Sequence, residues 1–312
     1  MQRPVYPFAP QREGKKKAIR VSRGDRVYYT ICYAIVIVLL LVVLYPLIFV
    51  VSASFSSASA VSTGKVVLFP VDFSLLSYES VFRYKNVWIG YRNTIFYTVV
   101  GTIINVALTM CCAYPLARQK FQGRRFFTML FTFTMIFSGG MIPSYLNMSS
   151  LGLLNTVWAM LLPGAMSVYN MVVARTFIQN NIPNELLEAS QIDGCSDTRF
   201  FFSVVLPLSK AVISVISLYY AVGHWNSYFS AFLYLHNTNL YPLQIFLREI
   251  LVQNQFDASM LYEDAEMVAQ RQGLQELIKY SMIVVSTLPL LCLYPFVQKF
   301  FNKGVMIGSL KG

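Results

Sequence analysis

A polar segment between two long apolar runs carries side chains suited to contacting another molecule. Its carboxylates can meet basic groups, and its small side chains let another chain approach closely. An Asp-Gly pair favours a tight turn, which the Asp can hold through its own side chain. We interpret the segment as a knob for a protein partner; the alternative is an ordinary amphipathic connector on the membrane surface. The candidate contact residues are Glu185, Glu188, Ala189, Ser190, Asp193 and Gly194, followed by Leu206 and Pro207.

Local signals predict that this segment begins as a short helix and ends it at a sharp corner. Pro183 suits the first turn of a helix, and the acidic Glu185 favours the positive end of the helix dipole. Gly194 suits the position just past a helix end, where the backbone is left-handed.

A second short helix is predicted to follow the corner. Ser196 or Asp197 can cap it, and it would run through Phe200–Val204. Leu206-Pro207 would end it and begin the next apolar run. The segment is therefore expected to consist of two short helices that lie across one face of the protein.

A second group of residues could line a path for a hydroxylated ligand, since an aromatic face beside an amide suits a sugar. The group comprises Tyr219, Tyr220, Trp225 and Asn226. At most one of the two adjacent tyrosines can face a pore. Anchoring at the membrane boundary is the alternative role for Trp225, because Trp is enriched there.

The remaining polar residues do not predict catalysis. Asn105 and Asn170 lie in apolar runs, where hydrogen bonding between helices is expected. We expect His224 to be a packing residue, and its spacing from His236 fits no metal site. The five cysteines show no metal spacing and act as small apolar residues. The sequence contains no Walker-type phosphate-binding loop.

The composition indicates a polytopic membrane protein. Of the 312 residues, 56% are hydrophobic and 12% are charged, whereas a soluble domain carries about 25% charged residues. A helix that crosses about 30 Å of hydrocarbon needs about 20 apolar residues. Gly139-Gly140 before Pro143 predicts a break in the third such helix. We predict an all-α fold with six transmembrane helices, at Ile31–Ser52, Ile95–Pro115, Phe126–Leu146, Val157–Phe177, Leu208–Leu235 and Tyr280–Phe301.

The distribution of basic residues predicts that both termini lie inside the cell. Cytoplasmic loops carry excess Lys and Arg, and this orientation places most of the 25 basic residues inside. Topology and attraction to the anionic lipid bilayer then explain the net charge of +11. Nucleic acid is therefore not an expected partner.

The predicted organisation is a basic cytoplasmic tail at 1–28, a transmembrane domain at 29–303 and a cytoplasmic tail at 304–312. The polar segment belongs to the cytoplasmic loop 179–207. One of the two outside loops contains an acidic patch of Glu263, Asp264 and Glu266, preceded by a short amphipathic helix over Leu243–Gln253.

The polar segment closely resembles the EAA loop of ABC importer permeases. Glu188-Ala189-Ser190-x-x-Asp193-Gly194 is followed, after residues 195–203, by Val204-x-Leu206-Pro207. The family pattern is E-A-A-x-x-D-G, then I-x-L-P at the same spacing, so Ser190 and Val204 are two conservative departures. In that family the loop forms a coupling helix that docks into a cleft on a cytoplasmic ATPase. The resemblance implies this role for the candidate contact residues.

Further segments resemble the sugar-importer branch, which includes maltose permeases. The stretch Ala113–Arg124, with A-Y-P-L-A-R followed by F-x-G-R, resembles the turn after the second span of that branch. Trp225-Asn226 and the tail Gly304-x-x-x-Gly308-x-x-Lys311-Gly312 are also typical. Leu243–Leu251 is similar to permeases assigned to oligosaccharides that contain uronic acids.

The resemblance implies the type I permease fold and a non-catalytic subunit that imports sugars or oligosaccharides through a bacterial plasma membrane. The implied partners are a second related permease, two cytoplasmic ABC ATPase subunits and an extracytoplasmic solute-binding lipoprotein. No cofactor is expected on this chain, because the ATPase subunits would bind ATP and Mg²⁺.

The rival interpretation is a stand-alone secondary transporter driven by an ion gradient. That class would show charged residues at mid-membrane and inverted repeats, and the sequence shows neither. A membrane enzyme is a third interpretation, disfavoured because no nucleophile–base or metal constellation occurs.

Overall fold

The computed structural model describes residues 22–253 and 273–292. These residues form α-, 3₁₀- and π-helices and no β-strand, which confirms the predicted all-α class for this part of the chain. Residues 1–21 of the basic tail, the acidic patch, the C-terminal glycine motif and residues 293–301 of the last predicted span lie outside the described residues.

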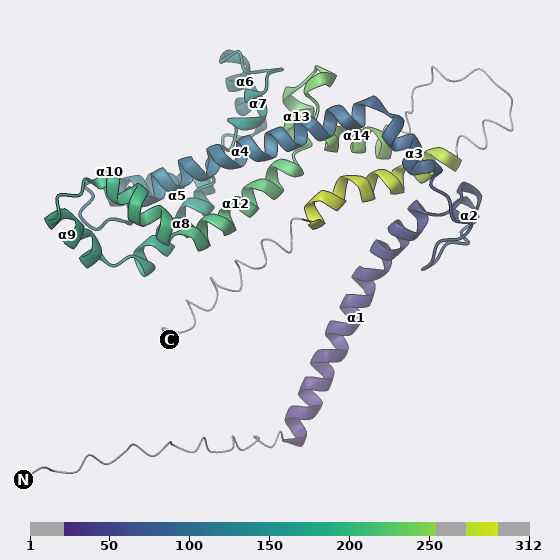
Figure 1. The fold of residues 1–312 in the computed structure, drawn as a ribbon, viewed down its shortest axis with the longest axis horizontal. Helices are drawn as coiled ribbons and strands as arrows, with labels where there is room; N and C mark the ends of the chain where they lie inside the picture. Colours follow the sequence, from purple (N-terminus) through teal and green to yellow (C-terminus); the bar gives the residue numbers. More distant parts are fainter. Residues whose placement is uncertain (1–21, 254–272, 293–312) are drawn as a thin grey trace, which may run out of the picture. The chain divides into compact units, whose positions relative to one another are not determined.

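The helices differ widely in length, and Figure 1 shows their order along the chain. Their bounds are α1 Arg23–Ser54, α2 Ala58–Ser62, α3 Leu76–Arg83, α4 Lys85–Ala117, α5 Arg124–Ile136, α6 Met141–Ser150, α7 Trp158–Leu161, α8 Val168–Asn181, α9 Asn184–Ile192, α10 Asp197–Phe200, the π-helix Phe201–Val205, α11 Leu206–Leu208, α12 Lys210–Trp225, α13 Phe229–Tyr234, the 3₁₀-helix Thr238–Leu240, α14 Leu243–Arg248, the π-helix Glu249–Gln253 and a last helix Gly273–Cys292.

The chain divides into two compact units after Ile48, within α1. The first unit includes most of α1, whose large apolar side chains are exposed, as expected for a helix surrounded by lipid. The second unit begins at Phe49 and contains the other helices.

Three described helices are long and apolar enough to cross a membrane: α1, α4 and Gly273–Cys292. Two bent pairs raise this number to five if each pair is one span. The first pair, α5 and α6, bends by 112° at the predicted Gly139-Gly140 break. The second pair bends by 79° between Leu208 and α12.

The predicted span Val157–Phe177 differs from the structure. It is divided between α7 and α8, with Pro163 and the left-handed Gly164 (φ 70°) between them. Proline interrupts helical hydrogen bonding and a left-handed residue ends the helical path, so one continuous helix cannot form there. The count of six spans therefore stays a prediction.

Helix α4 is the central element of the second unit, and α8 and α12 pack along it (Figure 1). The three helices share a core in which Ala113 of α4, Ala174 of α8 and Ile216 of α12 are fully buried. Small residues at such contacts let helix backbones approach closely within a membrane.

Polar contacts fix the crossing of α4 and α12. The His224 ring lies directly on Gly101, so a Cβ at position 101 would overlap the ring. The Asn105 amide lies 3.1 Å from His224 Nε2; with its oxygen toward the ring, its NH₂ group donates to the carbonyls of Gly101 and Ala165. These contacts confirm interhelical hydrogen bonding for Asn105 and a packing role for His224.

At the other end of α4, α14 lies against the helix backbone. Asn93 Nδ2 donates to the carbonyl of Asn239 at 2.7 Å, and the Leu243 N–H donates to Thr94 Oγ1 at 2.8 Å. Gly90 faces Leu243, where a Cβ would come within 2.9 Å of the Leu243 Cα. The predicted helix Leu243–Gln253 is present as α14 and the π-helix that follows it.

We predict that Gly90→Ala destabilises the protein by about 1–3 kcal/mol, because the new methyl group meets backbone atoms that cannot rotate away. Gly223→Ala is the matched control: it is also helical but has open space around it, and Ala favours helix by up to about 1 kcal/mol. Thermal unfolding of the detergent-solubilised chain should show a lower midpoint for Gly90→Ala alone. Equal midpoints would contradict the close approach of α14.

Candidate functional site

The polar segment forms the corner that its sequence predicts. Pro183 precedes α9 in an extended conformation. At the far end of α9, the Cys195 N–H donates to the Ser190 carbonyl at 2.9 Å, and the Gly194 N–H donates to the Gln191 carbonyl at 3.1 Å. Gly194 has a φ of +74°, the left-handed conformation expected of it. Backbone hydrogen bonds therefore close the corner, while the Asp193 side chain is exposed.

The second helix starts as predicted but ends later. The Ser196 hydroxyl caps it by accepting from the Arg199 N–H at 3.3 Å. The helical path then runs through α10, the π-helix Phe201–Val205 and α11, as far as Leu208. The expectation that Leu206-Pro207 ends this helix is wrong, because Pro207 occupies the first turn of α11, where no N–H is required.

The inner face of α9 is anchored to the helical core. Leu187 packs on the cluster that contains the buried Ile182, Phe200 and Val205. The Ser190 hydroxyl donates to the Leu187 carbonyl at 2.7 Å, so this side chain serves the helix itself. One side of α9 is thereby packed on this cluster.

The outer face of α9 is free in the described part of the chain. Leu186, Ala189 and Ile192 are spaced three residues apart and share an arc with Glu185. Ile192 is 87% exposed, and it immediately precedes the corner. Apart from Gly194 and its two neighbours in the chain, no described residue has an atom within 4 Å of the position that a Cβ on Gly194 would take.

Two ion pairs connect the segment to the turn that follows α4. Lys120 Nζ lies 3.2 Å from Glu188 Oε1, and both side chains are exposed. Arg118 Nη1 lies 2.6 Å from Asp197 Oδ1, and here only 17% of the arginine side chain is exposed. Burial lowers the pKa of Arg118, but Asp197 and Tyr114 raise it by more, so the guanidinium stays charged.

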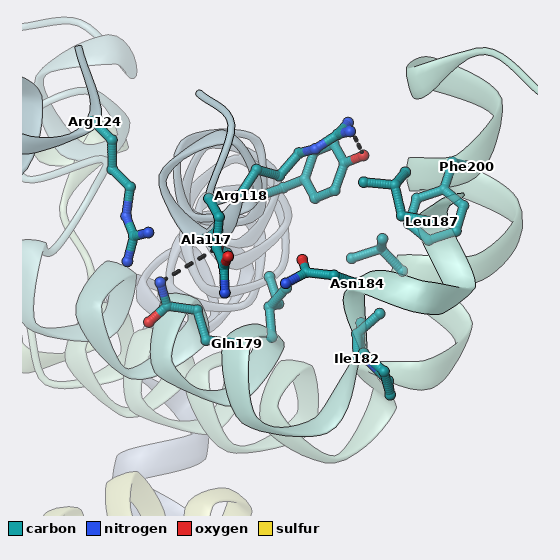
Figure 2. A pocket seen from close by; sticks show the side chains of 13 residues that line it. Ala117, Arg118, Arg124, Gln179, Ile182, Asn184, Leu187 and Phe200 are labelled. Atoms are coloured by element: carbon teal, nitrogen blue, oxygen red, sulfur yellow. Dashed lines mark hydrogen bonds between the residues drawn. The ribbon is translucent and has the colours of Figure 1, made fainter. Parts of the chain in front are cut away.

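A pocket of about 290 Å³ lies between the end of α4, the end of α8 and the two short helices. Figure 2 shows Arg124 and Gln179 on one side of it and Leu187 and Phe200 on another. The lining combines arginine and amide groups with apolar side chains and contains no acidic residue. Elsewhere in the described residues, no group of three or more His, Cys, Asp or Glu side chains could hold a metal ion.

The second predicted group of residues divides into buried and exposed members. The Tyr220 hydroxyl pairs with Thr109 Oγ1 at 2.6 Å and accepts from the Ser167 N–H at 2.9 Å, and Trp225 Nε1 donates to the Ser286 carbonyl at 3.0 Å. Both side chains are buried and join helices. Tyr219 and Asn226 are exposed.

The structure adds three residues that sequence reasoning did not assign to the site: Arg118, Lys120 and Ile192. The first two belong to the basic turn at the end of α4, which the sequence connects with topology through its charge and with sugar-importer permeases through its resemblance, and not with the contact site. Their contacts with Asp197 and Glu188 join positions far apart in the sequence, so no local pattern reveals them.

Comparison with known proteins places this geometry among transport permeases. No protein-family model matches the chain. It is 40% identical over 288 residues to the polygalacturonan/rhamnogalacturonan transport system permease protein YtcP of Bacillus subtilis (strain 168), covering 92% of this chain and 99% of that protein. It is 40% identical over 271 residues to protein LplC of the same strain, covering 87% and 90%.

A solved structure shares the fold. The chain matches a bacterial ABC transporter involved in the import of the acidic polysaccharide alginate with a TM-score of 0.82 and 34% sequence identity. The match covers 91% of this chain and 100% of that one.

We predict that Gly194→Val loosens the corner, because a β-branched residue in the left-handed region costs about 1–2 kcal/mol. Amide hydrogen exchange over residues 184–200 should become faster. Gly194→Asn is the control, since Asn tolerates this conformation better. Unchanged exchange in the valine variant would show that the corner does not require the left-handed backbone.

Proposed function

Because the chain belongs to the permease family of sugar ABC importers, we propose that α9 is the coupling helix that docks on a cytoplasmic ATPase. The chain is a membrane subunit of a sugar import system in the cell membrane. The observation that carries the proposal is the outer face of α9, where Leu186, Ala189 and Ile192 are exposed beside an open glycine corner.

An apolar side chain on this face would gain from burial in a partner. Full burial of an isoleucine stabilises a contact by about 1.5–3 kcal/mol, and 87% of Ile192 is available. Leu187 holds the opposite side of α9 in the core, so the helix offers this face without unfolding. Glu185 adds a negative charge that can meet a basic group, whereas Glu188 is paired with Lys120 in this chain.

The proposed assembly contains a second related permease, two ATPase subunits and an extracytoplasmic solute-binding protein. The ATPase subunits bind ATP and Mg²⁺ and hydrolyse the ATP, and this chain is non-catalytic. Nucleotide and the loaded binding protein must favour the same permease conformation, because each shifts the equilibrium only through its differential affinity for the two states. The proposed organisation keeps both termini inside, with tails at 1–28 and 304–312.

The proposed sugar path runs along the exposed face of α12. Tyr219, Gly223 and Asn226 lie on one side of this helix. Tyr219 offers an aromatic face, Asn226 offers an amide, and Gly223 leaves open space between them. Tyr220 and Trp225 support the path from behind through their buried hydrogen bonds.

The proposed substrates are oligosaccharides that contain uronic acids. One similar protein is a polygalacturonan/rhamnogalacturonan transport system permease, and a similar solved structure is of an ABC transporter involved in the import of the acidic polysaccharide alginate. In this chain Arg248 lies 4.4 Å over the Phe232 ring, and it forms no ion pair with any residue in 22–253 or 273–292. A guanidinium held on an aromatic ring suits a carboxylate of the substrate.

We predict that Ile192→Asp lowers co-purification of the ATPase subunits with the tagged permease by at least about tenfold, because it places a charge in the apolar contact. Leu75→Asp is the control, since Leu75 is also an exposed apolar residue but lies outside the cytoplasmic loop. Equal recovery of ATPase with both variants, at equal levels of inserted permease, would rule out docking on this face.

We predict that cells carrying the import system take up trigalacturonate at least about tenfold faster than its fully methyl-esterified form, because esterification removes the charges that a buried or stacked arginine recognises. Uptake of the two labelled sugars is compared at the same concentration. Preference for the neutral ester would overturn the acidic substrate class and leave the docking proposal intact.

A further inference from the structure

The last turn of α4 and its C-cap carry a motif, Tyr114 to Arg118, to which the docking proposal gives no role. Arg118 ends α4 and adopts an extended conformation, with its N–H donating to the Pro115 carbonyl at 3.1 Å. Its side chain folds back along the helix, so the guanidinium carbon lies 5.5 Å over the Tyr114 ring. Nη1 lies 2.9 Å from the Tyr114 hydroxyl, as the dashed line in Figure 2 marks.

The same nitrogen reaches across to the coupling segment. Arg118 Nη1 donates to Asp197 Oδ1 at 2.6 Å, and Asp197 is the first residue of α10. Hydrogen bonds between charged partners are short and strong. Because Arg118 is largely buried, removing the carboxylate would leave a buried charge without its partner, which is more serious than losing a surface pair.

Further contacts attach this ion pair to the transmembrane core. The Tyr114 ring lies 5.1 Å from the Phe201 ring, in the π-helix that follows α10. Two side chains of α8 cap the last carbonyls of α4: Arg175 Nε donates to Leu116 at 3.0 Å, and Gln179 Nε2 donates to Ala117 at 3.3 Å. The end of α4 is thus tied both to α8 and to the helix after the corner.

The coupling helix itself has weaker connections to α4. Its polar link, Lys120 to Glu188, joins two exposed side chains at 3.2 Å, and such pairs contribute little. Beside the apolar contact of Leu187 with the core, movement of α9 can pass through the closed corner into α10, and from α10 through Asp197 to Arg118.

We propose that Arg118 is a positioning residue that, through Asp197, makes α4 follow the coupling segment when the ATPase moves it. The inference rests on the docking of α9 proposed above. Loss of the ion pair should leave the ATPase bound and hydrolysing ATP, while the transmembrane helices respond less to nucleotide.

The test uses the full complex of this chain, its second permease and the ATPase subunits, with the native cysteines replaced and Gly223→Cys added as a reporter. The position is open, so a maleimide can reach it. The rate of maleimide labelling is measured without nucleotide and with ATP plus vanadate. Arg118→Gln and Asp197→Asn should each shrink the nucleotide-dependent change in rate at least about fivefold, the lower end of typical coupling between sites.

Three further variants sharpen the result. The double variant should be no worse than either single one, because both remove one interaction. Arg118→Lys should retain part of the change, since it keeps the charge but not the planar fork. Arg83→Gln removes a different arginine–carboxylate pair of 2.6 Å, exposed and away from the segment, and should have no effect.

Each other outcome overturns the inference. An unchanged response in Arg118→Gln and Asp197→Asn would show that α4 does not depend on the pair. Loss of bound ATPase in these variants would place Arg118 in docking rather than positioning. Failure of the docking proposal itself is seen separately, as normal ATPase recovery with Ile192→Asp.

Discussion

The packing of His224 on Gly101 is the contact on which the other arrangements depend. Lipid is as apolar as leucine, so helices in a membrane gain little from hiding apolar side chains from it. Close approach and hydrogen bonds must hold them together instead. Gly101 lets α12 approach α4 closely, and Asn105 forms hydrogen bonds to α12 and to the segment before α8. The pair Thr109–Tyr220 extends this seam along the same two helices.

Because its crossing with α12 is fixed, α4 can carry a displacement from its last turn to that crossing. From Gly101 to Ala117 the helix is continuous and about 24 Å long at 1.5 Å per residue. One end lies against α14, the middle is fixed to α12, and the last turn is capped by α8. A displacement delivered to the last turn therefore reaches the crossing with little loss.

Local chemistry explains which features could be predicted from the sequence. Gly194 and Ser196 mark the corner because a left-handed turn and a helix cap each depend on one residue and its immediate neighbours. The contact between Gly90 and Leu243 gives no such signal, since a glycine within a helix reads only as a weak helix former. Pro207 misled the prediction because proline both ends helices and begins them. The resemblance to the EAA loop identified the segment, whereas its attachment to α4 required the fold.

Exposed side chains along this chain face different surroundings, and only some of them suit the surroundings in which they lie. This difference indicates which surfaces contact other molecules. On α5 none of the side chains is buried, and most are apolar, so lipid alone accounts for that face. Tyr219 on α12 and Asn226 just after it are exposed polar side chains beside a helix that otherwise packs in the core; Asn226 Nδ2 donates to the Val222 carbonyl at 3.0 Å, and among the described residues the amide oxygen is left for another partner. Ile192 is the reverse case, an exposed apolar side chain in the loop for which the charge pattern predicts a cytoplasmic location. The proposed sugar path would cover the polar side chains on α12, and the proposed docking of the ATPase would cover Ile192.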